Sequence, residues 1–191
     1  VETMREEISQ RIAKRAIVFP TGFELKGGMV EDTNTPYLVK ILDEEGYTVT
    51  RGAIVEDDED DMVNKLDDAI NRAFGLILST GGVGAEDKDV SVESVLRLDP
   101  QAATPYVVKF SQGSGRHVKD GVRIAVGQVG PSLLVALPGP HDEVELAAGE
   151  LLPALAEGYG KEEIARRIAA VLAHKWVQDH GGNHHGQHGS H

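Results

Sequence analysis

The residues best suited to chemistry stand in a glycine-rich stretch that follows an apolar run ending at Thr80. Gly81, Gly82 and Gly84 form the turn, and Asp89 follows where a helix should begin. Glycine has no Cβ, so its backbone can adopt positive φ, approach a ligand closely and offer N–H groups to an anion. Asp89 can hold a metal ion, contact a ligand hydroxyl or cap the helix. The stretch predicts a site for a phosphate-bearing ligand at the end of a strand.

A run of acidic residues from Glu56 to Asp61 supplies further carboxylates, among them Asp57. Mg²⁺ prefers carboxylates and substrate phosphates, so Asp57 and Asp89 are the candidate magnesium ligands. The run is equally typical of a solvated helix start, where acidic side chains favour the positive end of the helix dipole. No lysine stands inside the glycine turn, and Lys88 directly precedes Asp89, so a Walker-type phosphate loop is excluded.

The charge balance limits the kind of partner. The 191 residues include 31 acidic and 19 basic side chains, a formal net charge of −12. Nucleic acids and anionic membranes demand a basic surface, so we expect neither as a partner and favour a small-molecule ligand. The sequence contains no cysteine, which excludes disulfides and thiolate chemistry. No apolar run approaches the roughly 20 residues of a membrane span, and we expect a cytoplasmic protein.

The first half of the chain alternates buried-strand runs with amphipathic helical patterns. After a leading helix at 3–14, which we expect to pack on the domain surface, this order is β-α-β-α-β and predicts a parallel sheet with right-handed crossovers. Thr33 or Asn34 can cap the first crossover helix. The predicted strands are 15–20, 47–55 and 75–79, and the predicted helices between them are 36–45 and 58–73.

The second half begins with a helix and then changes character. Two β-rich runs surround a polar turn, which predicts a small β-hairpin excursion before a last buried strand and two helices. The predicted elements are a helix at 90–98, β-rich runs at 105–110 and 122–127, a strand at 132–137, and helices from about 141 to 155 and at 161–178. We therefore predict a leading helix in 1–14, one α/β domain over 15–178, and a tail over 179–191.

The tail contains no apolar residue, and histidine and glycine dominate it. Neutral imidazole binds zinc, copper or nickel, but glycine-rich spacing does not preorganise a coordination geometry. We expect a disordered tail without a site of its own.

Three loops stand after predicted strands, at residues 22–34, 80–91 and 138–142. In a doubly wound sheet, loops at the carboxyl ends of the strands converge on one crevice, where ligands bind. The sequence leaves open whether His141 meets a ligand or stabilises the start of its helix.

The sequences of these loops, GFELKGGMVEDTNTPYL, STGGVGAEDKDVSVESV and LPGPHDEVE, together resemble the molybdenum cofactor biosynthesis (molybdopterin-binding) domain family. The resemblance extends from about residue 17 to about residue 155. Within the family, the chain is most similar to the N-terminal domain of competence/damage-inducible protein A, and it shares two of the motifs with the molybdopterin adenylyltransferases.

The resemblance implies a three-layer α/β/α domain, often a trimer, that binds molybdopterin in the crevice. In the adenylyltransferases, AMP passes from ATP to the pterin's terminal phosphate with magnesium. By position, Asp89 and Asp57 are the catalytic and metal-binding carboxylates. The implied ligand-binding residues are Thr80, Gly81, Gly82, Gly84, Ser91, Glu24, Asp32, Asn34, Pro138, Gly139 and Pro140, with Glu24 and Asp32 open to a second reading as loop caps.

The chain departs from the family pattern at three of these loop positions, where Val83, Ser91 and Phe23 replace threonine, threonine and aspartate. A lost hydroxyl at residue 83 removes a potential phosphate donor. Three functions stay open: magnesium-dependent adenylyl transfer to molybdopterin, a metal-dependent nucleotide-diphosphate (ADP-ribose) pyrophosphatase of the competence/damage-inducible type, and a non-catalytic pterin-binding module.

Overall fold

The computed structural model describes residues 2–22, 31–56, 58–81, 90–112 and 119–181. Its centre is a five-stranded sheet in the order β2-β1-β3-β7-β6. The first four strands in that order are parallel, and β6 runs antiparallel to β7. The strands are β1 (Arg15–Pro20), β2 (Thr48–Arg51), β3 (Leu76–Thr80), β6 (Ala125–Val129) and β7 (Ser132–Leu137).

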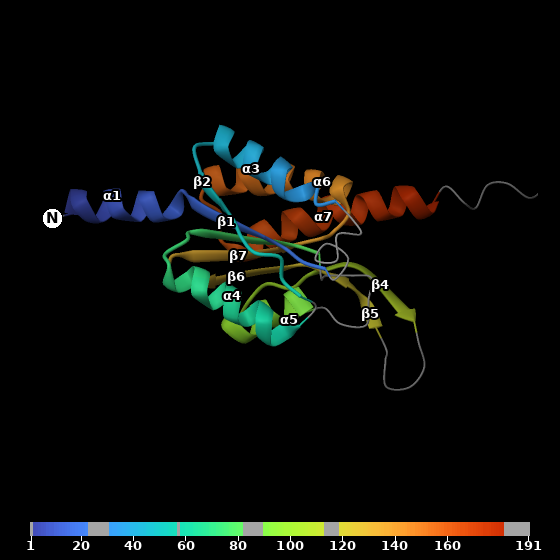
Figure 1. The fold of residues 1–191 in the computed structure, drawn as a ribbon. Helices are drawn as coiled ribbons and strands as arrows, with labels where there is room; N and C mark the ends of the chain where they lie inside the picture. Colours follow the sequence, from blue (N-terminus) through green and yellow to red (C-terminus); the bar gives the residue numbers. More distant parts are fainter. Residues whose placement is uncertain (1, 23–30, 57, 82–89, 113–118, 182–191) are drawn as a thin grey trace, which may run out of the picture.

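Helices cover both faces of this sheet, which confirms the three-layer α/β/α prediction (Figure 1). One face carries α3 (Asn34–Glu44), α6 (His141–Ala156) and α7 (Lys161–Gly181), and the other carries α4 (Glu59–Asn71) and α5 (Val90–Leu98). The central strands β3 and β7 are buried along their whole length, as expected of apolar runs that are covered on both sides.

The two β-rich runs of the second half form the predicted hairpin, but with different boundaries. Strands β4 (Tyr106–Gln112) and β5 (Lys119–Arg123) pair antiparallel in a sheet of their own. The predicted run 122–127 is divided at Ile124: residues before it pair with β4, and Ala125 onward joins the main sheet beside β7. Ile124 marks the transition, and its N–H donates to the Pro105 carbonyl.

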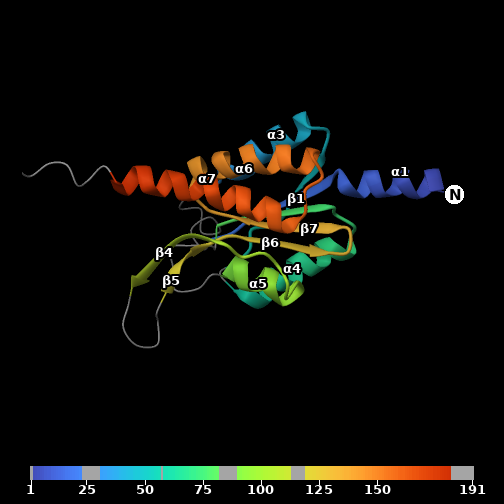
Figure 2. The ribbon, with the colours of Figure 1, turned by 180° about the vertical axis from the view of Figure 1, so that it is seen from behind.

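Two further elements differ from the predicted ones. Helix α1 (Glu2–Ala13) does not pack on the domain surface but extends away from it, as Figures 1 and 2 show, with Met4 69% and Ile8 57% exposed. Helix α7 continues to Gly181, past the predicted end at residue 178. Among the helices described, none has both the length and the apolar character needed to cross a bilayer.

Candidate functional site

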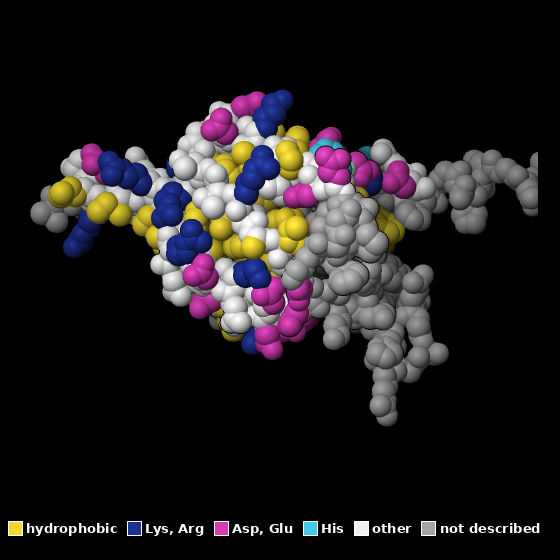
Figure 3. Space-filling model, in the orientation of Figure 1, with side chains coloured by type: hydrophobic (Ala, Val, Ile, Leu, Met, Phe, Trp, Pro, Cys, Tyr) yellow, Lys and Arg dark blue, Asp and Glu magenta, His cyan; other side chains and the backbone are white. Residues whose placement is uncertain are grey.

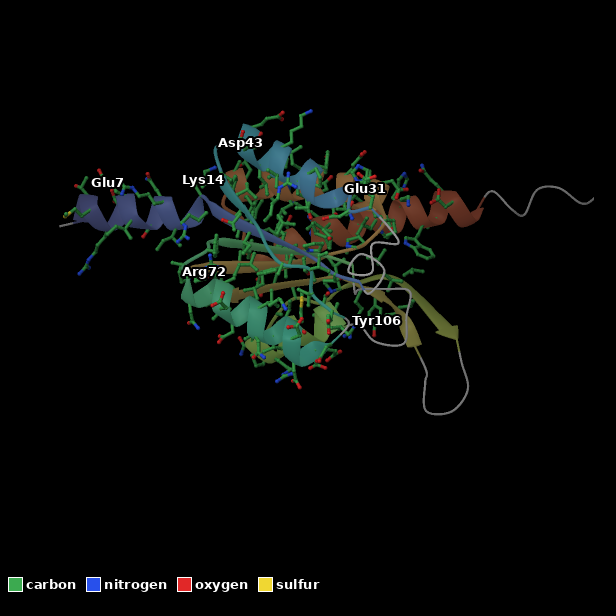
Figure 4. All side chains as sticks on the ribbon, viewed as in Figure 1. Glu7, Lys14, Glu31, Asp43, Arg72 and Tyr106 are labelled. Carbon is green, nitrogen blue, oxygen red and sulfur yellow. The ribbon has the colours of Figure 1, made fainter. Side chains whose placement is uncertain are left out.

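The carboxyl ends of three neighbouring parallel strands meet at one edge of the sheet. Pro20 of β1 pairs with Thr80 of β3, and Thr80 pairs with Leu137 of β7. The loops that follow therefore begin side by side. Figure 4 shows Glu31 at this end of the molecule and Asp43 at the other. The described first residues of the three loops lie together as predicted, and residues 23–30 and 82–89 of these loops lie outside the described part of the chain.

Backbone hydrogen bonds continue past the strands and hold the first residues of these loops together. The Thr80 carbonyl accepts from both the N–H (3.0 Å) and the hydroxyl (2.8 Å) of Thr21. The Gly81 N–H donates to the Leu137 carbonyl over 3.0 Å. This N–H is therefore already bonded within the sheet, and a ligand would have to use other donors.

The backbone conformation at residue 81 and the closeness of Thr21 favour glycine at this position. Its φ is +87°, in the left-handed region that glycine favours, and a Cβ built on it would lie 2.6 Å from the Thr21 hydroxyl oxygen. A side chain at this position would adopt a strained backbone conformation and would displace the Thr21 hydroxyl. Gly81 thus permits the close approach of two of the three loops.

Two of the predicted ligand-binding residues in this region are buried. Thr80 is 3% exposed, and Ser91, in the first turn of α5, is 0% exposed. The Ser91 hydroxyl donates to the Gly81 carbonyl over 2.9 Å, so it joins α5 to the glycine turn. In this arrangement the Ser91 hydroxyl stabilises the conformation at Gly81.

The loop after β7 approaches both of the other loops. Asn34 donates its side-chain N–H to the Gly139 carbonyl over 2.7 Å, and a Cβ built on Gly139 would lie 3.5 Å from the Gly81 Cα. Pro138 is buried, whereas Gly139 and Pro140 are exposed, and α6 begins directly after Pro140. Gly139 and Pro140 are therefore the accessible part of the predicted far wall.

Asp32 caps helix α3 in place of the predicted Thr33 or Asn34. One of its carboxylate oxygens accepts from the backbone N–H groups of Asn34 and Thr35, each over 3.1 Å. The Thr33 side chain makes no capping hydrogen bond. The cap leaves the Asn34 side chain free to reach Gly139.

His141 joins this group from the first position of α6. Its Nδ1 lies 2.9 Å from Asn34 Oδ1, and its Nε2 lies 2.9 Å from a carboxylate oxygen of Glu145. The edge of the Tyr37 ring packs against the imidazole, with 5.3 Å between the ring centroids. Burial and then the charge of Glu145 raise the pKa of Tyr37. The sequence had left the role of His141 undecided.

The described acidic residues at the start of α4 make contacts of their own. Asp58 caps α4 by accepting from the N–H groups of Asp60 and Asp61, and Asp61 pairs with Lys65. Arg97 of α5 pairs with Asp60 over 2.8 Å. Acidic side chains gather at this start of α4 (Figure 3), yet the described part of the chain contains no group of three or more carboxylates or histidines placed to hold a metal ion.

The remaining predicted site residues lie outside the described part of the chain. These are Glu24, Asp57, Gly82, Gly84 and Asp89. Both candidate magnesium ligands are among them, so the described residues neither support nor contradict a magnesium site.

A charged cluster that sequence reasoning missed adjoins the far wall. Lys175 of α7 pairs with Asp142 over 2.7 Å and with Asp179 over 3.6 Å. The hydrogen bond from Lys175 lowers the pKa of Asp142, and the same bond raises the pKa of Lys175. Burial raises the pKa of Glu143, which is 8% exposed. Lys175 and Asp142 are more than thirty residues apart in sequence, so no local pattern marks this pair.

A shallow groove of about 430 Å³ lies between α7 and the segment from Ala103 to Tyr106. Its α7 wall consists largely of alanine, with Glu162 and Arg166 also lining it. None of the predicted site residues that the structure describes lines this groove.

Comparisons with known proteins agree with the fold. A CinA-like protein of Fervidobacterium nodosum is 39% identical over 82 residues, which make up 43% of this chain and 20% of that protein. The chain also spans less than two thirds of the length of the other curated relatives.

Solved structures of similar fold include a CinA protein of Thermoplasma acidophilum, with a TM-score of 0.60, 22% identity, and coverage of 76% of this chain and 98% of that chain. Another is the molybdopterin biosynthesis Mog protein of Mycobacterium ulcerans, with a TM-score of 0.63, 20% identity, and coverage of 80% and 99%. The family described as "Probable molybdopterin binding domain" matches residues 17–157. The chain therefore belongs to the molybdopterin-binding domain family of molybdenum cofactor biosynthesis and CinA-like proteins.

Proposed function

We propose that the chain binds molybdopterin at the edge where the loops after β1, β3 and β7 meet. The observation that carries the proposal is the close approach of the described loop ends: Thr21 donates to the Thr80 carbonyl, a Cβ built on Gly139 would lie 3.5 Å from the Gly81 Cα, and Asn34 donates to the Gly139 carbonyl. Ligands of doubly wound sheets bind at such a place. Family membership supports molybdopterin as the ligand.

We propose further that the terminal phosphate of the bound pterin attacks the α-phosphate of ATP with Mg²⁺, so that AMP is transferred to the pterin and pyrophosphate leaves. Such transfers depend on positioning and on neutralising charge, and the protein takes little part in covalent chemistry. Asp89 and Asp57 would hold the magnesium ion, which would neutralise the phosphate charge. The described residues contribute the frame: Asp32 and Asn34 fix one loop, and Ser91 fixes the glycine turn against α5.

A second candidate is the hydrolysis of a nucleotide diphosphate such as ADP-ribose. The observation that favours it is the similarity to CinA-like proteins, the sequence relative with 39% identity included. The same carboxylates and metal would serve, with water as the attacking group. A pterin-binding module without catalysis is the third candidate, because Val83 and Phe23 depart from the family pattern.

Product analysis separates these functions. The protein and its Asp89→Asn and Asp57→Asn variants are incubated with molybdopterin, ATP and Mg²⁺, and separately with ADP-ribose and Mg²⁺, and the products are resolved by chromatography. Adenylylated pterin from the unmodified protein, lost in Asp89→Asn, is the expected result. AMP and ribose phosphate from ADP-ribose with no pterin product would favour the hydrolase, and pterin binding without either product would leave the module.

A further inference from the structure

His141 occupies a position from which it contacts two of the three loops at the proposed site. Its Nδ1 lies 2.9 Å from Asn34 Oδ1 and 3.4 Å from the Thr33 hydroxyl oxygen, at the junction between the loop after β1 and the start of α3. The residue itself directly follows Gly139 and Pro140, which belong to the loop after β7. Figure 3 shows histidine beside acidic side chains on this surface of the molecule.

The hydrogen-bonding groups fix the direction of each contact. The Gly139 carbonyl oxygen can only accept, so the Asn34 group 2.7 Å away from it must be the side-chain NH₂. The Asn34 carbonyl oxygen then faces His141, and Nδ1 must carry a hydrogen to donate to it. The three groups form a closed chain in which His141 donates to Asn34 and Asn34 donates to the backbone beside His141.

Other contacts hold the imidazole in this orientation. Glu145, one helical turn further along α6, faces Nε2 over 2.9 Å and is the charged partner of the ring. Tyr37 of α3 packs edge-on against the ring. The His141 side chain is 38% exposed and the Glu145 side chain is 51% exposed, so the pair is still accessible from solvent.

We propose that His141 is a positioning residue that holds the loop before α3 against the loop after β7 and so fixes the opening of the ligand site. This inference rests on the proposed molybdopterin binding. The acting atom is Nδ1: its N–H orients the Asn34 amide, and the amide in turn fixes the Gly139 carbonyl. Glu145 contributes by orienting the ring.

Two amide variants separate the roles of the two ring nitrogens. In His141→Asn, the side-chain NH₂ stands where Nδ1 stood and can donate to Asn34. In His141→Gln, the NH₂ stands where Nε2 stood and can reach only Glu145. If Nδ1 carries the function, molybdopterin binding measured by calorimetry is kept within about twofold in His141→Asn and weakened about tenfold in His141→Gln, the loss expected from one positioning hydrogen bond.

Hydrogen–deuterium exchange of the Asn34 and Thr35 amides supplies a readout that needs no ligand. We expect faster exchange in His141→Gln than in His141→Asn or the unmodified protein, at unchanged melting temperature. Equal exchange and equal affinity in both variants would overturn the positioning role, as would an equal loss in both. If the unmodified protein binds no molybdopterin, the proposed function fails, and the exchange rates alone then decide whether His141 holds the loop.

Discussion

Two polar junctions each join three elements of this domain, and they differ in burial and in how many hydrogen bonds their side chains make within the protein. The Asp99 joint, made of Asp99, Lys161 and the Gln101 and Gln128 backbone N–H groups, joins the end of α5 to β6 and α7. The His141 junction, made of His141, Asn34, Gly139 and Glu145, joins α3, α6 and the loop after β7.

The difference in exposure separates a structural role from a functional one. The Asp99 and Lys161 side chains are 10% and 18% exposed, and the Asp99 carboxylate accepts three hydrogen bonds from within the protein. Burial would raise the pKa of Asp99, but the bonds from Gln128, Lys161 and Gln101 together lower it. A saturated, buried joint stabilises the fold, whereas the half-exposed His141 junction stands at the strand ends and is open to a ligand.

The largest expected effect comes from the Asp99 joint. Asp99→Ala leaves Lys161 and two backbone N–H groups without their acceptor, so we expect unfolding free energy to fall by about 3 kcal/mol in urea titration. The pKa of Asp99 is lowered in the folded protein, so Asp99 stabilises the fold fully at pH values above the pKa of a carboxyl group in the unfolded chain. This stabilisation is lost as the pH falls through the lowered pKa. Asp99→Asn serves as the matched control with a smaller loss. Equal stability of Asp99→Ala and the unmodified protein would contradict the structural role of the Asp99 joint.

The next largest effect separates two glycines at the strand ends. Gly81→Ala places a Cβ at φ +87° and 2.6 Å from Thr21, so we expect a loss of about 2 kcal/mol of unfolding free energy. Gly139→Ala meets only ordinary contact at 3.5 Å and should be within about 0.5 kcal/mol of the unmodified protein. Thermal unfolding of both variants measures this difference. Similar losses of unfolding free energy would mean that the two glycine positions are equally close-packed.

A smaller effect concerns the cap that places Asn34 at the junction. Asp32→Ala removes the acceptor for the Asn34 and Thr35 N–H groups and should cost about 1 kcal/mol of stability. Asp32→Asn and Asp32→Ser keep a capping oxygen and should cost less. Chemical denaturation measures all three, and an alanine variant as stable as the serine variant would contradict the capping role.

The smallest effect has the opposite sign. Burial raises the pKa of Glu143 above that of the unfolded chain, so this group costs stability once pH rises through the unfolded and then the folded pKa. Glu143→Gln should therefore stabilise the protein by less than about 1 kcal/mol at pH 7, and the gain should vanish in acid. A gain that is independent of pH would assign it to packing instead.

Much of the fold follows from local patterns in the sequence. Strands β1, β3 and β7 were predictable because a strand that is covered on both faces consists of a continuous apolar run. Helix α4 was predictable because a helix that is covered along one stripe repeats its apolar residues with the helical period. The boundary between β5 and β6 was not, because the two strands follow one another with only Ile124 between them and are separated by their pairing partners, β4 and β7.

The site was predictable as a set of loops and less so as a set of roles. The convergence after β1, β3 and β7 follows from parallel topology. The inward orientation of Ser91 and the identity of the α3 cap depend on side-chain directions that residue type does not determine. His141 and Asn34 are 107 positions apart in the sequence, so only the folded chain reveals their contact.

The central claim is that the strand ends form the molybdopterin site, and its most direct test is calorimetric titration of molybdopterin into three proteins. These are the unmodified chain, Gly139→Val at the strand ends and Asp99→Asn in the Asp99 joint. We predict saturable binding to the unmodified chain, at least tenfold weaker binding to Gly139→Val, and unchanged affinity in Asp99→Asn. Equal affinity of Gly139→Val and the unmodified chain, or no binding to the unmodified chain, would contradict the claim.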